Sequence, residues 1–193
     1  MSQNLVRAFL AIPLGDELKR KLTQLQRQLA ENLPGASWPR PDNLHLTLRF
    51  FGDVTHEDLE KIRVSMLSIE GFQQAFEVRV AGLGAFPHPR RPRVIWVGLS
   101  PAALLQKLYL QLQSSLAQAG VAQEARPFKP HLTIGRLRHF GPDMSQMIAS
   151  TGNLCCGTLR VDQLVLYQSR LLPGGAEHLP LYTLTLPSQR KGA

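Results

Sequence analysis

His45-Leu46-Thr47-Leu48 is the stretch that decides the fold of this 193-residue chain, because His131-Leu132-Thr133-Ile134 repeats its pattern 86 residues later. A histidine and a threonine two positions apart on a β-strand point to the same face of the sheet, and the aliphatic residues beside them point to the other. Each copy therefore predicts a strand that turns an imidazole and a hydroxyl towards a cleft while its aliphatic side chains enter a core.

The repeat extends beyond these two stretches. At the same interval Arg7 corresponds to Arg93, and the pair Arg40-Pro41 corresponds to Arg126-Pro127. Two copies are too few for a solenoid, whose units need several neighbours. They predict an α+β fold with two pseudo-twofold-related lobes, each an antiparallel β-sheet with outer helices, around a central cleft. We expect a single bilobal domain over 1–193, with the repeat at roughly 5–54 and 91–140 and with C-terminal strands within 157–186 completing the sheets.

Hydrophobic periodicity predicts strands at 6–12, 43–51, 76–80, 93–99, 130–137, 157–168 and 178–186. It predicts helices at 16–31, from Thr55 to about Ser68, from Ser100-Pro101 to Gly120, and at 142–150. We interpret 82–93 as a loop, and the broken apolar alternation between Val161 and Leu164 as a β-bulge. The polar tail after Pro187 is expected to be loose.

The composition favours a polyanionic partner and a reducing compartment. The net charge is +8, and the basic residues are spread along the chain, which indicates a positive groove rather than a basic tail. The two cysteines, Cys155 and Cys156, are adjacent, which disfavours a structural disulfide and fits the cytoplasm. The N-terminus does not have the order of a signal peptide, and no apolar run approaches the roughly 18–20 residues of a membrane span, so we expect no membrane association.

Two histidines facing each other across a cleft suit the cleavage of a phosphodiester. With an ordinary pKa of about 6.5, one imidazole can be neutral and take a proton from water while the other is protonated and donates to the leaving oxygen. Hydroxyls of Thr47 and Thr133 would donate to the non-bridging oxygens. This chemistry needs no metal and no cofactor. His56, His139 and His178 have no partner at metal-ligand spacing and are expected to be surface residues.

One His-x-Thr pair on its own is better explained by a structural histidine. Duplication preserves core leucines readily, but it gives no packing reason to retain a histidine and a threonine on the same face twice. The pair of motifs, rather than either one, therefore supports a catalytic interpretation.

The two motifs resemble the signature motifs of the two-histidine (2H) phosphoesterases. The segments 82–87, 93–98 and 166–171 are similar to the bacterial and archaeal RNA 2′,3′-cyclic phosphodiesterase branch, also described as 2′-5′ RNA ligase-like. This resemblance implies metal-independent hydrolysis of an RNA 2′,3′-cyclic phosphate end to a 2′-phosphate. It implies that His45 is the proton donor to the 3′-oxygen, that His131 is the base, and that Thr47 and Thr133 bind phosphate. The two copies are so alike locally that the residues alone do not separate the histidines' roles.

Candidate RNA-binding residues are Arg49, Arg126, Lys129 and Arg136. On strict alternation Arg49 and Lys129 share the face of their histidines, Arg126 lies at a strand entrance, and Arg136 points away unless the strand twists. The aromatic residues Phe50, Trp96 and Tyr167 are better interpreted as core than as stacking platforms. The basic segment 88–93 is equally compatible with an RNA contact and with a solvated loop.

The expected partner is RNA, or a nucleotide, with a 2′,3′-cyclic phosphate, and the expected oligomeric state is a monomer. Two alternatives stay open. The same site could cleave small cyclic nucleotides, or cleave or join 2′-5′ linkages. The protein could also be a non-catalytic RNA-binding module, although binding alone needs no matched acid and base.

Overall fold

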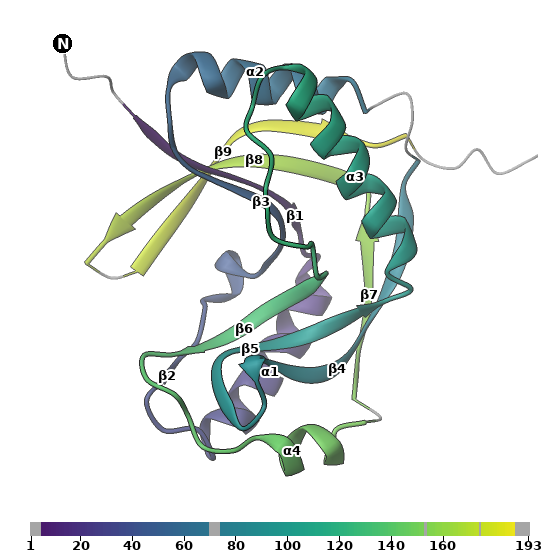
Figure 1. Ribbon diagram of the computed structural model, residues 1–193. Coiled ribbons are helices and arrows are strands. Elements are labelled where there is room, and N and C mark those ends of the chain that lie inside the picture. The colour runs from purple at the N-terminus through teal and green to yellow at the C-terminus, as the bar shows by residue number, and fades with distance from the viewer. Residues whose placement is uncertain (1–4, 70–73, 153, 174, 188–193) are drawn as a thin grey trace, which may run out of the picture.

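The computed structural model describes residues 5–69, 74–152, 154–173 and 175–187, and it contains two antiparallel sheets arranged as two lobes (Figure 1). The first sheet has the strand order β3-β1-β8-β9, with bounds His45–Val54, Val6–Pro13, Gln163–Leu172 and Gly175–Thr185. The second has the order β2-β6-β5-β4-β7, with bounds Ala36–Ser37, His131–Leu137, Arg91–Ser100, Phe76–His88 and Cys155–Val161. The expected pseudo-twofold arrangement is confirmed, since the neighbours β1 and β3 correspond to the neighbours β5 and β6.

The two lobes exchange elements along the chain. Helix α1 (Asp16–Ala30) follows β1 of the first sheet, yet it packs against β6 and β7 of the second. Helix α3 (Ala103–Gln118) follows β5 of the second sheet and lies beside α2 (His56–Leu67) over the first sheet (Figure 1). The short helices are the 3₁₀ turn η1 (Pro41–Asn43) and α4 (Ser145–Ser150). Buried side chains from both lobes consequently form one continuous hydrophobic cluster.

The predicted helices form for the reasons that the sequence indicates. The stripe of Leu18, Leu22, Leu25 and Leu29 on α1 is buried, and the opposite face is exposed. At the start of α2 the side chain of Thr55 accepts a hydrogen bond from the backbone N–H of Asp58, at 3.1 Å, and the Asp58 carboxylate accepts from the Thr55 backbone N–H. The capping box is therefore confirmed. Helix α3 begins later than expected, at Ala103, because Ser100 is still the last residue of β5.

The predicted loop at 82–93 is wrong, because this segment forms most of a long β-hairpin. Strand β4 continues to His88 and pairs with β5, which leaves only Pro89 and Arg90 between the strands. Gly82 has a φ of +74° at the point where the register shifts between Ala81 and Leu83. Only glycine adopts this conformation without a steric penalty, so Gly82, where the loop was predicted to begin, forms a bulge within the strand.

The single strand predicted at 157–168 is also wrong. Strand β7 ends at Val161 in the second sheet, and β8 begins at Gln163 in the first. The interrupted alternation therefore marks a change of sheet at Asp162 rather than a bulge within one strand. The carbonyl of Asp162 accepts a 2.7 Å hydrogen bond from the Leu186 N–H, beside the end of β9.

Cys155 and Cys156 are both free, the first exposed and the second buried. No helix within the described ranges is long and apolar enough to cross a membrane. The tail after Pro187, which was expected to be loose, lies outside the described residues.

The close approach of β4 to the Trp96 ring predicts a stability effect. A Cβ atom at Gly84 would lie 2.2 Å from that rigid ring. We expect Gly84→Ala to lower the free energy of unfolding by about 1–3 kcal/mol, because overpacking displaces the ring or the strand. Urea denaturation followed by tryptophan fluorescence measures this. In the matched control Gly152→Ala, the added Cβ would meet nothing nearer than 3.6 Å, so the change should stay within about 0.5 kcal/mol. Equal losses in the two variants would contradict the packing argument.

Candidate active site

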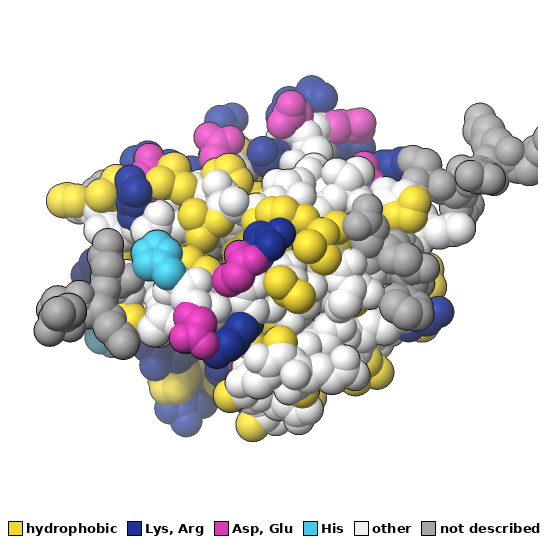
Figure 2. All heavy atoms as spheres, turned by 90° about the horizontal axis from the view of Figure 1, so that it is seen from above, with side chains coloured by type: hydrophobic (Ala, Val, Ile, Leu, Met, Phe, Trp, Pro, Cys, Tyr) yellow, Lys and Arg dark blue, Asp and Glu magenta, His cyan; other side chains and the backbone are white. Residues whose placement is uncertain are grey.

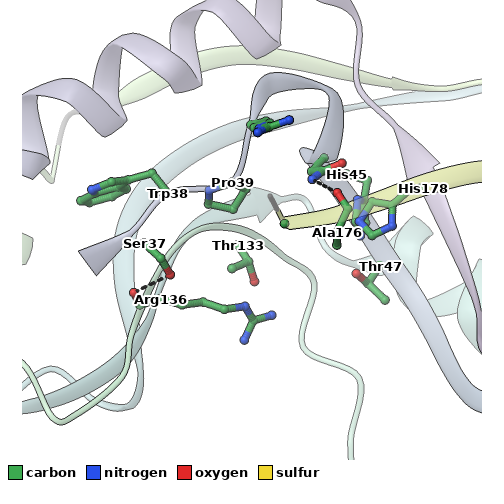
Figure 3. Close-up of a pocket in the computed structure, with 12 residues that line it drawn as sticks. Ser37, Trp38, Pro39, His45, Thr47, Thr133, Arg136, Ala176 and His178 are labelled. Carbon is green, nitrogen blue, oxygen red and sulfur yellow. Dashed lines mark hydrogen bonds between the residues drawn. The ribbon is translucent and has the colours of Figure 1, made fainter. Parts of the chain in front are cut away.

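A cavity of about 350 Å³ lies between the two lobes, and side chains from both of the histidine strands line it (Figure 3). His45 and Thr47 come from β3, and Thr133 and Arg136 come from β6. The threonines lie on opposite sides of the cavity, and the guanidinium of Arg136 extends into the space beside Thr133 (Figure 3). The predicted convergence of the two repeats on one site is thus present for these four residues.

His45 packs against a cluster of aromatic rings. Its imidazole stacks on Phe9, with centroids 4.8 Å apart, and it makes a hydrogen bond with the backbone of Asn43. Burial is the main reason that the pKa of His45 falls from 6.5 to about 4, and the positive charges of His178 and Arg136 lower it further. The hydrogen bond with Asn43 acts in the opposite direction but is weaker. His45 is therefore neutral near pH 7 in the free protein.

His131 occupies the equivalent place as the first residue of β6. Its Nδ1 lies 2.5 Å from the carbonyl oxygen of Lys129, and its ring meets Phe86 edge-on at 5.0 Å. It adjoins the cavity rather than lining it, and it shares a strand face with Thr133 two residues on. Burial lowers the pKa of His131, and the charge of Arg136 adds to this effect.

Both histidines are oriented by the same local contact. Each ring bonds to the backbone of the residue two positions earlier, which is Asn43 for His45 and Lys129 for His131. At His131 the Nδ1–H must donate to the Lys129 carbonyl, which leaves Nε2 free for the cleft. The contact therefore selects a tautomer as well as a ring orientation.

A bulge explains why strict alternation misplaces two arginines. In β3 the register passes from Thr47 to Arg49, and in β6 from Thr133 to Gly135, so each strand has one extra residue directly after its threonine. The extra residue reverses the parity of the residues directly after it, and in β3 this lasts until a second shift between Phe50 and Gly52. Arg136 consequently faces the cavity, although a regular strand would turn it away.

The same parity change removes Arg49 from the cleft, contrary to the prediction. Arg49 is buried, and its guanidinium donates to the side chain of Gln113 on α3 and to the carbonyl of Ala122. Arg49 therefore links β3 to α3.

Phe50, which was interpreted as core, is 44% exposed, and Arg7 lies over its ring.

The other two predicted RNA-binding residues also lie outside the cavity lining. Arg126 is exposed and forms an ion pair with Glu124 at 3.3 Å, beside the groove next to α3. The Nζ of Lys129 is 5.9 Å from the centroid of Phe86, the ring that His131 also contacts. Trp96 and Tyr167, which were interpreted as core, are half-buried and lie outside the hydrophobic cluster. They pack against Phe86 and Phe9, with their rings 6.4 Å from those of His131 and His45.

His178 is a cavity residue that the sequence interpretation placed on the surface. It lies on β9, and its ring meets that of His45 at 5.4 Å in an edge-on arrangement. Asn43 holds the start of β9 against η1, because its side-chain amide donates to the Ala176 carbonyl at 2.8 Å (Figure 3). Strand β9 has no counterpart in the repeat, so the internal symmetry carries no signal for this residue.

The cavity is of nucleotide size. Its lining includes two imidazoles, three hydroxyls and two guanidinium groups, which belong to His45 and His178, to Ser37, Thr47 and Thr133, and to Arg40 and Arg136. The imidazole of His131 adjoins it. Such a set can exchange protons on two sides of a bound phosphate and can hold its charge. In the described part of the chain, no three His, Cys, Asp or Glu side chains are grouped as a metal site would need.

Two known protein families together match residues 12–170 of the chain. Residues 12–96 match the LigT-like phosphoesterases, and residues 68–170 match the 2′-5′ RNA ligase superfamily. An RNA 2′,3′-cyclic phosphodiesterase of Methanothermobacter thermautotrophicus is 34% identical over 183 residues, which cover 92% of this chain and 95% of that protein. One of Archaeoglobus fulgidus is 32% identical over 179 residues, covering 92% and 96%.

Solved structures give the same result. A protein of Thermus thermophilus superposes with a TM-score of 0.78 at 25% identity, covering 95% of this chain and all of that one. E. coli LigT complexed with 3′-AMP superposes with a TM-score of 0.73 at 27% identity, covering 95% and 99%. The fold and the paired His-x-Thr strands are those of a two-histidine phosphoesterase. The chain belongs to the LigT-like phosphoesterases of the 2′-5′ RNA ligase superfamily.

The burial of His45 predicts a pH dependence of stability. The folded protein protonates His45 only near pH 4, whereas the unfolded chain does so near 6.5. The free energy of unfolding should therefore fall as the pH is lowered from about 6.5 to 4, by up to roughly 3 kcal/mol from this group. Above that window His45 is neutral in both states, so it should add no pH dependence to the free energy of unfolding. Urea unfolding at several pH values measures this. The difference between wild type and His45→Gln isolates the contribution, and parallel curves would contradict it.

The contact with His178 predicts a change in the titration of His45. His178→Gln removes a positive neighbour, so the pKa of His45 should rise while staying below 6.5, because burial, the larger cause, remains. NMR of the imidazole signals follows this directly. The control His139→Gln alters an exposed ring and should leave the titration of His45 unchanged. An identical pKa in the His178 and His139 variants would rule out the coupling.

Proposed function

We propose that this protein hydrolyses the 2′,3′-cyclic phosphate end of RNA to a 2′-phosphate, with two histidines as general acid and base and without a metal ion. The observation that carries this proposal is the matched orientation of His45 and His131. Each imidazole is fixed through a backbone contact, on strands from opposite lobes, beside a cavity lined by Thr47, Thr133 and Arg136. The relatives described above are RNA 2′,3′-cyclic phosphodiesterases, and a LigT structure contains 3′-AMP.

The reaction requires proton transfers on two sides of phosphorus. Water attacks the phosphorus atom and loses a proton to a neutral imidazole, while the bond to the 3′-oxygen breaks and an imidazolium protonates that oxygen. The products are a 3′-hydroxyl and a 2′-phosphate monoester. Hydroxyls of the two threonines and the guanidinium of Arg136 donate to the non-bridging oxygens, where charge accumulates in the transition state.

The environment of the two histidines supports the roles that the family resemblance implies. The pKa of His45 is about 4, so its imidazolium is a strong acid, as a donor to the 3′-oxygen should be. Burial and Arg136 lower the pKa of His131, but no second histidine contributes, as His178 does for His45. This ring therefore suits the base that activates water. The anionic phosphate of the substrate favours a proton on an adjacent imidazole, which offsets burial when the substrate is bound.

A small cyclic nucleotide is the second candidate substrate. The cavity volume of about 350 Å³ lies near the lower end of ordinary ligand pockets, enough for a terminal nucleotide but not for a longer RNA. Cleavage or joining of 2′-5′ linkages would use the same groups.

We also propose that residues 1–193 act as one bilobal domain, as a monomer in the cytoplasm. One chain supplies both histidines and both threonines, so the site needs no second copy. The exchange of α1 and α3 between the sheets favours joint folding of the lobes. The free thiols of Cys155 and Cys156 are compatible with a reducing compartment.

Substitution of either histidine should nearly abolish turnover. We expect His45→Ala and His131→Ala each to lower kcat at least about 10²-fold on an RNA with a 2′,3′-cyclic end, because each removes one proton transfer. The control His56→Ala alters an exposed histidine on α2 and should keep wild-type activity. Chromatography of the digested end should identify a 2′-phosphate, and EDTA should leave the rate unchanged.

Three outcomes would contradict this function. A 3′-phosphate product would exclude departure of the 3′-oxygen, and loss of activity on chelation would exclude the metal-free mechanism. A wild-type protein that binds RNA and turns nothing over, with both histidine variants binding equally well, would favour a non-catalytic RNA-binding module.

A further inference from the structure

Beyond the cavity, the surface carries a cluster of exposed arginines around one exposed phenylalanine. Phe140 is 47% exposed, with the guanidinium of Arg91 4.2 Å from its ring centroid and that of Arg93 at 5.5 Å. Arg138 is exposed two residues before Phe140. We refer to Arg91, Arg93, Arg138 and Phe140 as the arginine–phenylalanine platform.

Backbone contacts hold this platform in place. The side chain of Arg93 donates to the carbonyl of Arg138 at 2.7 Å, and the N–H of Gly141 donates to the carbonyl of Pro92 at 2.9 Å. These bonds fasten the segment after β6 along the start of β5. The Arg91 guanidinium is stacked on the Phe140 ring, and a guanidinium stacked in this way still presents its N–H groups at its edge.

The platform is continuous with the active site. Arg136 lines the cavity, and its partner across the ladder is Val94, the residue after Arg93. Arg138 follows Arg136 by two residues, about 7 Å along the chain at the usual strand rise. A chain bound at the cavity can therefore reach the platform along the end of β6.

The charge of the platform is uncompensated within the described part of the chain, unlike that of the outer helices. On the upper face of the molecule, basic and acidic side chains lie side by side (Figure 2). On α2, for example, Lys61 pairs with Glu57 at 2.8 Å, and Arg63 pairs with Glu60. No ion pair among the described residues involves Arg91, Arg93 or Arg138. Asp143 lies nearby, but on the side of Arg90 and His88.

We propose that the platform binds the single-stranded RNA that precedes the cyclic end, with a base stacked at Phe140 and phosphates contacted by the arginines. This inference rests on the proposed function and names its substrate class as RNA chains rather than mononucleotides. Exposed aromatic and guanidinium planes recognise unstacked bases, and uncompensated arginines recognise the backbone. A duplex hides its bases, so a single-stranded end is the chain that fits.

Two substrates that share one reacting nucleotide separate the platform from the chemistry. One is a 2′,3′-cyclic mononucleotide, and the other is a ten-nucleotide single-stranded RNA ending in the same cyclic nucleotide. Phe140→Ala should lower kcat/KM for the oligonucleotide about 10-fold, the scale of losing one stacked base, and leave the mononucleotide unchanged. Arg91→Gln should weaken the salt dependence of kcat/KM for the oligonucleotide. The slope of log kcat/KM against the logarithm of the salt concentration should become shallower by about 0.7. The control Arg27→Gln alters an exposed arginine on α1 and should change neither substrate.

The ratio of the two kcat/KM values decides the proposal, because misfolding lowers both in proportion. A ratio that stays at the wild-type value in both Phe140→Ala and Arg91→Gln overturns it. A loss on the oligonucleotide that Arg27→Gln reproduces also overturns it, since general charge would then be the cause. If the wild type hydrolyses neither substrate, the proposed function fails and the platform is judged separately. Fluorescence anisotropy with the same RNA carrying a 2′-phosphate then supports it if Phe140→Ala weakens binding about 10-fold, and overturns it if the affinities are equal.

Discussion

The site depends on a backbone contact made where two strands begin. Both β3 and β6 start at the histidine itself, and the residues two positions earlier, Asn43 and Lys129, lie outside the ladder. Their backbone groups are therefore available to the imidazoles, whereas inside a strand they would pair with a neighbouring strand. The Pro41–Asn43 turn and Pro130 keep the preceding chain out of the sheet. Ring orientation, tautomer and the direction of the following threonine all follow from this start.

The duplication supplies two similar halves, but the proposed acid–base mechanism requires two different ones. The bulge occurs at the same place in both strands, so the positions that face outward just after it are Phe50 in β3 and Arg136 in β6. One half presents a phenyl ring and the other a guanidinium. Strand β9, which has no counterpart in the repeat, then adds His178 beside His45. The protein thus differentiates its two imidazoles through neighbours rather than through the repeated motif.

The periodicity of the sequence predicts the repeat, the helices and the histidine strands, since the leucine stripes and the His-x-Thr alternation are strong local patterns. It does not predict the bulges, because one extra residue leaves the composition of the strand unchanged. That residue nevertheless moves Arg49 and Arg136 to the opposite face of the sheet. It also misses the β4–β5 hairpin, where glycine and proline commonly end strands but here produce irregular pairing. The change of sheet at Asp162 and the placement of His178 depend on contacts between distant segments, for which a single sequence has no local signal.

Under the proposed mechanism, the lowered pKa values of His45 and His131 mean that the acid forms only when a phosphate is bound. Without a phosphate, burial and the charge of Arg136 keep both imidazoles neutral near pH 7, so the free site has a base but no acid. A bound phosphodiester brings a negative charge that Arg136 and the threonine hydroxyls hold in place, and this charge favours a proton on one imidazole. His45 is the more deeply buried ring and has His178 beside it, so it binds a proton weakly. In the proposed mechanism this proton is the one that passes to the leaving oxygen. Arg136 therefore has two opposing effects: it raises the cost of the imidazolium in the free protein, and it secures the anion that makes the imidazolium accessible.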